Sequence, residues 1–470
     1  MNILINEEEN KKSAKIAEKV DKKSKKIIKL KQMTRKKINR REKKDKKRIL
    51  SCNKKLLKVD NDSKEILLKI NEFNTNGKKT IVYFIDSYYP IIDGVVSVME
   101  NYAKYMSDFY NVVVCAPKHK KETYVSDKYF VLGSNSVYLK KTNYDMGLPQ
   151  IDDEFSKYIE MLKIDLIHIN SPFTMGMYGL SIAKKRHIPS ITTFHSQFKQ
   201  DFYKATNSKL LAQVFTGIII NLYNKSTVTL TMNDFAAKIM KQYGLKRKKV
   251  QIVPNATSME YKEFDKDYEK QVLEKYGYQK RKFNMLFIGR LVKVKNVYFI
   301  LKVINELSKI NKDFMFTFIG IGQEENKMKK YCEDNNLTNF VQFVGKITDE
   351  DEKAILIKNN DLLFFPSYYD TDGIVKIECA CYSVPTLCLE NTGVAAGLKN
   401  KINGFIEVDD LKLVVKRINW LSKNMSYVKR IGENAKEQVY ITWNEVGSKL
   451  RNIYEKLLNM KNLKGAKTLK

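Results

Sequence analysis

The chain has 470 residues, of which 43% are apolar and 29% are charged, and its 85 Lys and Arg against 53 Asp and Glu give a formal net charge of +32. This length is too great for one hydrophobic core and predicts two or three domains, while the cationic excess is typical of proteins that meet polyanions, either nucleic acid or an anionic membrane. No uninterrupted apolar stretch of about 18 residues occurs, so a transmembrane helix is not expected, and the basic N-terminus lacks the apolar core of a secretory signal.

The basic excess is concentrated at the N-terminus. Residues 1–60 carry 23 Lys or Arg and 8 Asp or Glu, with only isolated apolar residues between them. Such a segment cannot bury much apolar surface, and it is either disordered or a long solvated helix. We therefore predict that residues 1–76 form a basic extension that ends in a short linker.

The next part of the chain alternates short apolar runs with runs of helical spacing. The predicted elements are, in order, strand 80–85, helix 95–106, strand 111–116, strand 165–169, helix 175–185 and strand 190–194. Strands that alternate with helices indicate a parallel α/β sheet.

The same pattern restarts after residue 280. It predicts strand 283–288, helix 297–307, strand 314–319, helix 324–333 and further strands at 341–344, 362–365 and 385–389. Two α/β units joined near residues 246–282 are therefore expected. Ligands of such sheets bind outside the carboxyl ends of the strands, and with two sheets facing each other the cleft between them is the default site.

The six cysteines lie mostly in apolar runs, where cysteine acts as a small hydrophobe. They form no C-x-x-C pair, and the C-x-C spacing of Cys379 and Cys381 has no second cluster that would complete a zinc site. A reduced, cytosolic protein is the interpretation that fits this pattern.

Residues 364–378 are the most informative stretch of the chain. An apolar run ends at Pro366, a polar loop follows as far as Gly373, and helical spacing then leads to Glu378. A helix N-terminus offers free N–H groups to a phosphate, a glycine allows close approach of the backbone to a ligand, and the carboxylates of Asp370 and Glu378 can accept hydrogen bonds from sugar hydroxyls. The stretch therefore predicts a site for a sugar attached to a phosphate.

The sequence Asp370-Thr-Asp372 is also of a kind that holds Mg²⁺ or Mn²⁺ on a nucleotide sugar. Basic residues and helix N-termini are already available in this chain to neutralise phosphates. Metal dependence is therefore the less favoured interpretation, and neither a metal nor another cofactor is predicted.

The loop after the strand 283–288 carries candidate phosphate-binding residues. It begins with Gly289 and Arg290 and includes Lys295. Arginine can hold phosphate oxygens bidentately, and lysine adds a point charge. A solvated loop is the alternative, because basic residues are frequent throughout the chain.

A second glycine-containing loop, Gly320-Ile-Gly322, follows the strand 314–319. It fits a tight turn beside a nucleotide. It lacks the third glycine of a dinucleotide fingerprint, which disfavours an enzyme that uses nicotinamide.

Two residues of the first α/β unit are candidates for the same site. Gly94, at the end of Pro90-Ile-Ile-Asp-Gly94, would place free N–H groups at a helix start, and a plain turn is the alternative. His195 ends the strand 190–194, so its side chain is expected to project from the carboxyl end of the sheet; a functional and a structural role are both open. His168 lies inside a strand and fits a core histidine.

Together these residues resemble the family 4 retaining glycosyltransferases, which have the GT-B fold of two facing Rossmann-like domains. The resemblance covers roughly residues 79–460 and rests on the order and spacing of residues 89–95, 165–173, 193–195, 253–255, 289–295, 320–322 and 366–378. Residues 369–375, 390–393 and 403–405 look most like the diacylglycerol glucosyltransferase branch.

The resemblance implies an α/β fold of the GT-B type with parallel sheets, preceded by the basic extension. Residues 77–260 would form the N-terminal acceptor domain, and residues 261–440 the C-terminal domain for a nucleotide-sugar donor. Residues 441–470 would form a helix that crosses back onto the N-terminal domain, followed by a basic tail.

The resemblance also implies roles for the phosphate-binding candidates. Arg290 and Lys295 would bind the donor diphosphate, and Gly289 and Gly322 would lie at the donor beside them. Gly94 would approach the donor phosphate from the other domain.

The remaining candidates would hold the donor sugar and the nucleotide. Asp370 stands where the family usually has the first Glu of an E-x₇-E motif, near the donor sugar hydroxyls, and Glu378 would lie at the nucleotide ribose. Gly373 and Ile374 would offer backbone N–H groups to the phosphate or the sugar. His195 would contact the donor sugar and help to orient the reacting centre.

The expected activity is transfer of a hexose, with glucose from UDP-glucose as the expected donor, to a membrane lipid such as 1,2-diacylglycerol. The basic residues 11–58 and 461–470 would hold the enzyme on the anionic cytoplasmic face of the cell membrane. A glycosyltransferase for a cell-envelope polysaccharide precursor is an alternative. A nucleic-acid-binding protein is a further alternative, disfavoured because the basic segment has no aromatic residue before Phe73 for base stacking.

The stretch 210–220 is unusually apolar for a surface helix. It could dip into a membrane interface, and a buried helix fits its length equally well.

Overall fold

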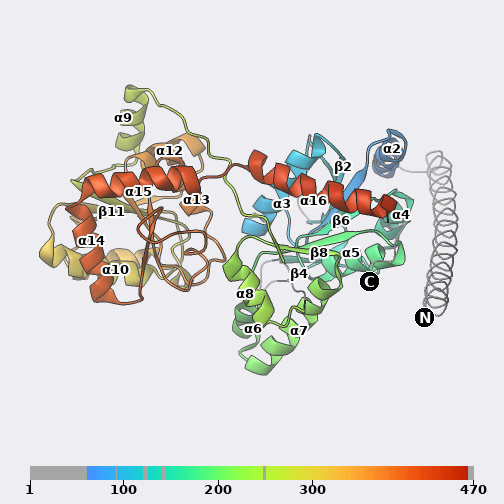
Figure 1. The fold of residues 1–470 in the computed structure, drawn as a ribbon, viewed down its shortest axis with the longest axis horizontal. Helices are drawn as coiled ribbons and strands as arrows, with labels where there is room; N and C mark the ends of the chain where they lie inside the picture. The colour runs from blue at the N-terminus through green and yellow to red at the C-terminus, as the bar shows by residue number, and fades with distance from the viewer. Residues whose placement is uncertain (1–60, 92, 120–124, 140–143, 247–249, 464–470) are drawn as a thin grey trace, which may run out of the picture. The chain divides into compact units, whose positions relative to one another are not determined.

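The computed structural model describes residues 61–463 except 92, 120–124, 140–143 and 247–249 (Figure 1). The basic segment that is predicted to meet the membrane lies almost wholly outside these residues. The chain divides into two compact units, of which the first holds the residues up to Ile191 and from Leu450 onwards, and the second holds Thr192–Lys449. The domain boundaries implied by the family resemblance stay predictions.

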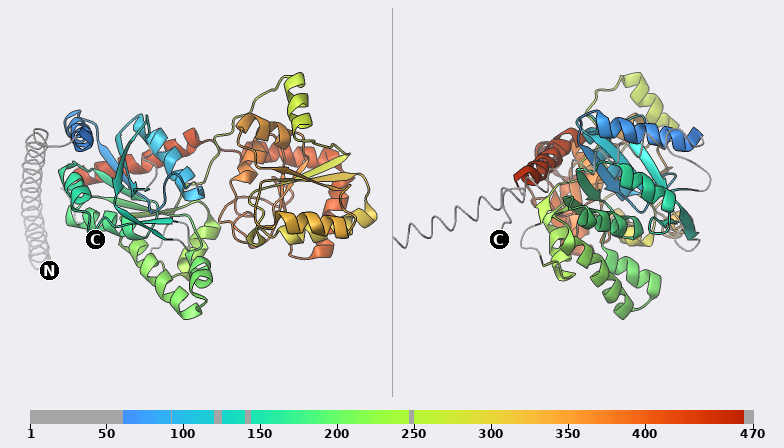
Figure 2. Two further views of the ribbon diagram at one scale, coloured as in Figure 1. Left: turned by 180° about the vertical axis from the view of Figure 1, so that it is seen from behind. Right: turned by 90° about the vertical axis from the view of Figure 1, so that its right-hand side faces the viewer.

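The first unit is built on parallel strands. Its elements are α2 (Asn61–Thr75), β1 (Thr80–Phe84), α3 (Gly94–Ser107), β2 (Asn111–Pro117), β3 (Phe130–Ser134), the antiparallel pair β4 (Ser136–Leu139) and β5 (Tyr144–Gly147), α4 (Asp153–Met161), β6 (Leu166–Ile169) and α5 (Thr174–Lys185). The sheet order is β3-β2-β1-β6, followed by β7 (Ser190–Phe194), β8 (Val228–Thr231) and β9 (Gln251–Ile252). Helix α3 packs on β2, and α5 packs on β1 and β6; helices cover the strands in both views of Figure 2.

Helix α2 belongs to the folded unit. Leu67, Ile70 and Phe73 are buried at a spacing of three residues, and the Asn74 side-chain amide donates to the Met161 carbonyl at 2.9 Å. The prediction that all of residues 1–76 form a solvated extension is therefore wrong for residues 61–75. Because lysines lie between the apolar positions, the sequence pattern did not indicate that one face of this helix is buried.

The end of the long helix α16 (Trp443–Leu463) packs in the first unit. The buried Tyr454 hydroxyl lies 2.8 Å from the Tyr83 hydroxyl and 2.6 Å from His168 Nδ1. His168 is fully buried, so its predicted role as a core histidine is confirmed. A polar group inside a core needs such a partner, and Tyr454 provides it.

The second unit contains the other sheet and the helices between β7 and β9. The helices before that sheet are α6 (Phe198–Thr206), α7 (Lys209–Lys225), α8 (Asp234–Gln242) and α9 (Lys266–Lys275). The strands are β10 (Phe283–Ile288), β11 (Phe314–Ile319), β12 (Val341–Gly345), β13 (Leu362–Phe364), β14 (Thr386–Leu389) and β15 (Phe405–Glu407). The remaining helices are η1 (Lys293–Lys295), α10 (Val297–Ile310), α11 (Glu325–Asp334), α12 (Glu350–Lys358), α13 (Val375–Cys381), α14 (Leu411–Ser422) and α15 (Met425–Gln438).

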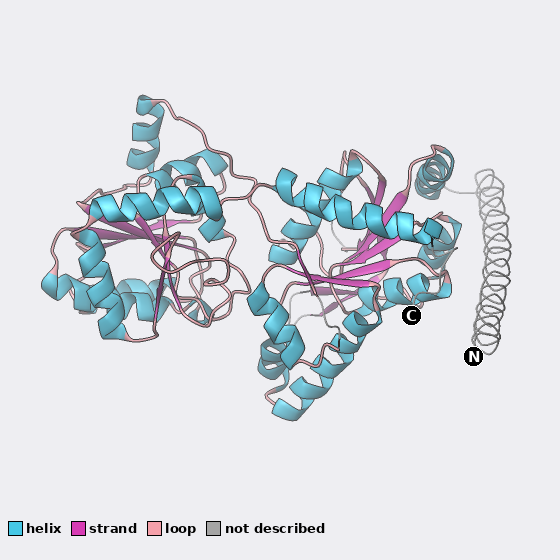
Figure 3. Ribbon diagram, in the orientation of Figure 1, coloured by secondary structure: helices cyan, strands magenta, loops and turns pink. Residues whose placement is uncertain are grey.

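The second sheet has the parallel order β12-β11-β10-β13-β14-β15 and lies between helices (Figure 3). Every residue of β10 and β11 is buried, as expected for parallel strands covered on both faces. The predicted parallel α/β architecture is confirmed in both sheets. Because β10 and β13 are neighbours, the loops that follow them lie at one edge of the sheet.

None of the helices in the described part of the chain is long and apolar enough to cross a bilayer.

Candidate functional site

The loop between β13 and α13 contains the stretch that the sequence singles out. The predicted strand, turn and helix are confirmed, with α13 beginning at Val375. Gly373 has a φ of +80°, a left-handed conformation that glycine adopts without strain. Among the described residues, no group accepts a hydrogen bond from the N–H of Gly373 or Ile374. Two adjacent backbone donors are therefore available to a ligand.

Asp370 in this loop is paired with Lys295. Lys295 Nζ lies 2.5 Å from Asp370 Oδ1, and the two side chains are only 14% and 18% exposed. The other carboxylate oxygen, Asp370 Oδ2, is buried and accepts no hydrogen bond from the described part of the chain. Leaving a buried acceptor unpaired costs free energy, and a hydroxyl donor from a ligand would remove that cost.

Asp372 faces a different cation. Its carboxylate lies 2.7 Å from Lys376 Nζ, and both residues are buried. The same ammonium donates to the carbonyls of Ala396 at 2.7 Å and Val394 at 3.1 Å. The two aspartates of the D-x-D sequence are thus paired with different lysines, Asp370 with Lys295 and Asp372 with Lys376. Within the described residues, no group of three or more His, Cys, Asp or Glu side chains could hold a metal ion.

Glu378 lies on α13 and is paired with Lys353 of α12. The two charged groups are 3.3 Å apart, and each side chain is 15% exposed. Burial raises the pKa of Glu378, and the Lys353 ammonium opposes this rise. Its predicted contact with a ribose stays a prediction.

Arg290 lies at the carboxyl end of β10, one residue after Gly289. It is exposed, and no carboxylate of the described residues lies within ion-pair distance of it. Burial and the Asp201 carboxylate raise the pKa of the Tyr369 hydroxyl, while the charge of Arg290 opposes this rise. Arg290 is therefore a free cation close to the loop that carries Asp370.

Gly322 lies against the backbone of the Arg290 loop. A Cβ at this position would be 2.2 Å from the Leu291 carbonyl oxygen and 2.7 Å from the Leu291 nitrogen. The close approach of two backbones explains the glycine without a ligand. Its predicted place at the donor stays a prediction.

Gly322→Ala is expected to lower the free energy of unfolding by about 1–3 kcal/mol, because the added methyl group overpacks a contact with rigid backbone. Urea titration followed by tryptophan fluorescence measures this change. Gly94→Ala is the matched control, since a Cβ at Gly94 meets no atom within 4 Å and its free energy of unfolding should change by no more than about 0.5 kcal/mol. Equal stability of the two variants would contradict the packing role.

His195 follows β7 and is buried. The Thr371 hydroxyl donates to the His195 carbonyl at 2.8 Å, and the Gln197 side-chain amide donates to the Tyr369 carbonyl at 3.3 Å. Tyr369 also donates to the Asp201 carboxylate of α6. These residues all belong to the second unit, so the segment after β7 and the Asp370 loop are held together. The structure brings His195 to the same loop as Asp370.

Burial lowers the pKa of His195 to about 4, so the imidazole is neutral at pH 7. The unfolded chain protonates histidine near pH 6.5, and it therefore binds one proton more than the folded state between about pH 4 and 6.5. The free energy of unfolding is expected to fall by up to about 3 kcal/mol as the pH is lowered through this window.

Urea midpoints measured from pH 7 to pH 4 test this pH dependence. His195→Gln should flatten the slope, while His187→Asn, at an exposed position, should leave it unchanged. A slope that His195→Gln does not alter would show that His195 titrates as in the unfolded chain.

Gly94 is the first residue of α3 in the first unit. The Asp93 side chain caps this helix by accepting from the N–H groups of Val95 and Val96, both at 2.9 Å. The helix start predicted at Gly94 is confirmed, and Gly94 is exposed.

Sequence reasoning missed several residues that shape this site. Lys376 and Lys353 fix the two acidic residues of α13 and its loop, and Asn233 donates to the Thr371 carbonyl at 2.8 Å. A lysine inside the apolar pattern of Ile374, Val375 and Ile377 was the available signal for Lys376, because a buried lysine requires a partner.

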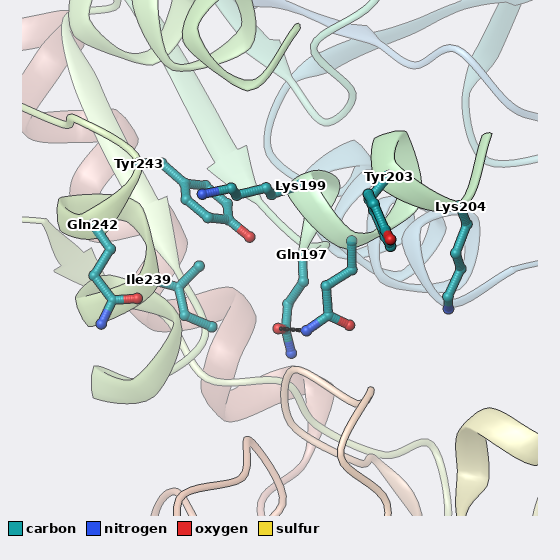
Figure 4. A pocket seen from close by; sticks show the side chains of 8 residues that line it. Gln197, Lys199, Tyr203, Lys204, Ile239, Gln242 and Tyr243 are labelled. Atoms are coloured by element: carbon teal, nitrogen blue, oxygen red, sulfur yellow. Dashed lines mark hydrogen bonds between the residues drawn. The ribbon is translucent and has the colours of Figure 1, made fainter. Parts of the chain in front are cut away.

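A pocket of about 470 Å³ adjoins the segment after His195 (Figure 4). It lies between α6 and α8 and is lined by Gln197, Lys199, Gln200, Tyr203, Lys204, Ile239, Gln242 and Tyr243. Gln200 donates to the Gln197 side-chain oxygen at 3.0 Å across its floor. Its lining combines glutamine and lysine side chains with the rings of Tyr203 and Tyr243 and the aliphatic side chain of Ile239.

Known structures share this architecture. HepE of Anabaena in complex with UDP-glucose superposes with a TM-score of 0.63 at 14% identity, over 80% of this chain and 99% of that chain. The fold, with its two parallel α/β sheets, is that of the GT-B class.

Sequence comparisons identify the family. The Glycosyltransferase Family 4 model matches residues 92–261, and the model for glycosyl transferases group 1 matches residues 269–438. The alpha-monoglucosyldiacylglycerol synthase of Acholeplasma laidlawii is 24% identical over 367 residues, 75% of this chain and 90% of that protein. The synthase of the same name from Streptococcus pneumoniae is 22% identical over 53% of this chain and 58% of that protein. The chain belongs to the family 4 glycosyltransferases and is an enzyme.

Proposed function

We propose that this enzyme is a retaining glycosyltransferase that moves a hexose, glucose from UDP-glucose, to a membrane lipid such as 1,2-diacylglycerol. The observation that carries the proposal is the state of the Asp370 loop. One carboxylate oxygen is bound by Lys295, the other is buried without a donor, and the N–H groups of Gly373 and Ile374 are free nearby. Sugar hydroxyls can donate hydrogen bonds to the carboxylate, and phosphate or hydroxyl oxygens of the nucleotide sugar can accept hydrogen bonds from the N–H groups.

The cations beside this loop suit a diphosphate. Arg290 can hold phosphate oxygens bidentately, while Lys295 adds a charge that Asp370 keeps in place. Gly289 and Gly322 would lie at the donor beside these cations, as the family resemblance implies. Negative charge develops on UDP as the bond to the sugar breaks, and fixed cations stabilise that charge most in the transition state. Gly94 would meet the phosphate from the start of α3.

The neutral His195 would contact the donor sugar through hydrogen bonding. An imidazole with a pKa of about 4 is neutral at pH 7 and brings no positive charge to the reacting centre. It would therefore orient the sugar by hydrogen bonding without forming an ion pair with Asp370. Glu378 would accept from the ribose hydroxyls while Lys353 holds its carboxylate in place. In this proposal the diphosphate is neutralised by side chains, and activity should persist in EDTA.

The lipid acceptor is supported by the similarity to two alpha-monoglucosyldiacylglycerol synthases. The basic residues 11–58 and 461–470 would attract an anionic leaflet at about 1 kcal/mol for each lysine or arginine near the surface. We therefore place the enzyme on the cytoplasmic face of the cell membrane.

The test is a donor and acceptor screen with the full chain. UDP-glucose, UDP-galactose and UDP-N-acetylglucosamine are each offered with vesicles that contain diacylglycerol, with monoglucosyldiacylglycerol, or with soluble sugars. Mass spectrometry should find monoglucosyldiacylglycerol from UDP-glucose, and NMR should find the α anomer. Transfer only to soluble sugars, or release of UDP only in the presence of RNA, would overturn the proposal.

A further inference from the structure

Helix α7 has two apolar faces. One is buried and contains Ala212, Thr216, Ile219 and Ile220. The other is exposed and contains Leu210, Leu211, Val214, Phe215 and Ile218, whose spacing of one, three and four residues places them on one side of the helix. The buried-helix alternative for residues 210–220 is therefore confirmed for one face of α7, and the interfacial alternative stays a prediction for the other.

The apolar side chains on the exposed face of α7 are highly accessible to solvent. Leu210 is 73% exposed, Ile218 is 52% exposed and Val214 is 49% exposed. Single exposed apolar residues are ordinary, but a contiguous group on one helix face marks an interaction surface. Helices α6 and α7 pack against each other as a hairpin, which is green in Figure 1.

The hairpin carries mainly positive charge, with Asp201 as its one acidic residue. Lys199, Lys204 and Lys209 are exposed on the hairpin, and no acidic residue occurs between Asp201 and Asp234. Asp201 itself accepts from Tyr369. A helix with an exposed apolar face and lysines nearby in the same hairpin has the pattern of a helix that lies in an anionic membrane interface.

Two pockets that share Lys199 and Tyr203 adjoin the hairpin. The pocket of Figure 4 includes Lys199, Tyr203 and Lys204. A second pocket of about 440 Å³ shares Lys199 and Tyr203 and adds Lys209, Ala212 and Gln213 of α7. Lysine and tyrosine side chains are suitable donors to the phosphate of an anionic lipid headgroup.

We propose that the α6–α7 hairpin is a membrane-docking surface, in which the exposed face of α7 enters the interface of an anionic bilayer and the lysine-lined pockets receive lipid headgroups. The surface is distinct from the basic segments at the two ends of the chain. The lysines and arginines of those segments supply electrostatic attraction, which salt screens, whereas the binding of buried apolar side chains persists at high salt.

Vesicle flotation of the full chain tests the apolar face. Vesicles of phosphatidylcholine with phosphatidylglycerol are floated in 0.1 M and in 1 M NaCl. Wild type should retain a bound fraction at 1 M NaCl, and Leu210→Ser/Val214→Ser/Ile218→Ser should lower that salt-resistant partition about tenfold or more. The control Ile310→Ser/Ile402→Ser/Leu413→Ser removes side chains that are 58%, 48% and 46% exposed elsewhere and should float like wild type. Equal floating of both triple variants overturns the proposal.

A second comparison tests the lysines. Lys199→Gln/Lys204→Gln/Lys209→Gln should reduce the preference for anionic over neutral vesicles more than Lys302→Gln/Lys412→Gln/Lys416→Gln, which removes the same net charge from exposed positions on α10 and α14. Equal effects would assign the preference to net charge and overturn the role of the pockets.

A spectroscopic probe gives a direct readout of insertion. Val214→Trp should show a blue-shifted emission on anionic vesicles and quenching by brominated lipids, measured against the wild-type signal of the two natural tryptophans. An unshifted spectrum contradicts insertion.

The inference rests on the proposed function only in its choice of a lipid partner, and the two can fail separately. Variants of α7 that no longer float should still glycosylate diacylglycerol dispersed in detergent. If wild type floats through α7 but no lipid is glycosylated, the docking surface stands and the proposed acceptor fails.

Discussion

Replacing Arg290 by alanine should lower kcat for transfer from UDP-glucose by a factor of about 10²–10³, the usual effect of removing one charged or hydrogen-bonding group that stabilises a transition state. Arg290 is exposed at the carboxyl end of β10 and has no carboxylate partner among the described residues. Under the proposed function, its charge is therefore available for the departing UDP. Initial rates with saturating UDP-glucose measure the loss in kcat.

Stability separates this role from a structural one. The free energy of unfolding of Arg290→Ala should lie within about 0.5 kcal/mol of the wild-type value, because an exposed side chain without an ion-pair partner contributes little to stability. Lys293→Ala removes a cation from an exposed position in the same loop and should keep most of the activity. Arg290→Lys should be intermediate, since lysine restores the charge without the bidentate geometry. Wild-type turnover in Arg290→Ala would show that another group stabilises the leaving UDP.

The buried strands were the part of the fold that the sequence predicted best. β7, β10 and β11 have the predicted bounds, because a continuous apolar run bounded by polar residues has few other interpretations in a parallel sheet. The short edge elements were not predicted. β9 has two residues and β15 has three, which is too short for any periodicity to be recognised.

The ion pairs of the site could be predicted only in part. Lys295 and Asp370 are 75 residues apart, and nothing local connects them. They meet because β10 and β13 are neighbours in the sheet, and both follow the carboxyl ends of these strands. Strand order, which depends on the packing of the whole unit, was the missing information.

Lys376, the buried partner of Asp372, was also not recognised from the sequence. From the sequence, Asp372 belongs only to the less favoured metal-binding pattern Asp370-Thr-Asp372, and no cation partner of its own is indicated. The structure gives it a buried one four residues later on α13. In a chain with 85 lysines and arginines, charge alone cannot distinguish a buried lysine from the many that are solvated, and burial decides its energetic importance.

The largest loss of stability is therefore expected at Lys376. Lys376→Met should lower the free energy of unfolding of the second unit by about 3–5 kcal/mol, the usual cost of removing one partner of a buried ion pair. The ammonium uses its three donors on Asp372 and on the carbonyls of Val394 and Ala396. Its loss leaves a carboxylate and two carbonyls buried without a donor. Urea titration followed through Trp420, which lies in the second unit, measures the change.

A double-mutant cycle distinguishes the pair from simple loss of packing. Asp372→Leu/Lys376→Met removes both charges, and it should recover part of the stability because no unpaired charge stays buried. Lys270→Met is the control, since Lys270 forms an exposed pair with Glu274 at 3.8 Å that should contribute less than about 0.5 kcal/mol. If the double variant is no more stable than Lys376→Met, the cost lies in the carbonyls and not in Asp372. If Lys376→Met is as stable as Lys270→Met, Asp372 is solvated in solution, and the buried ion pair does not contribute to the stability of the loop that presents Asp370.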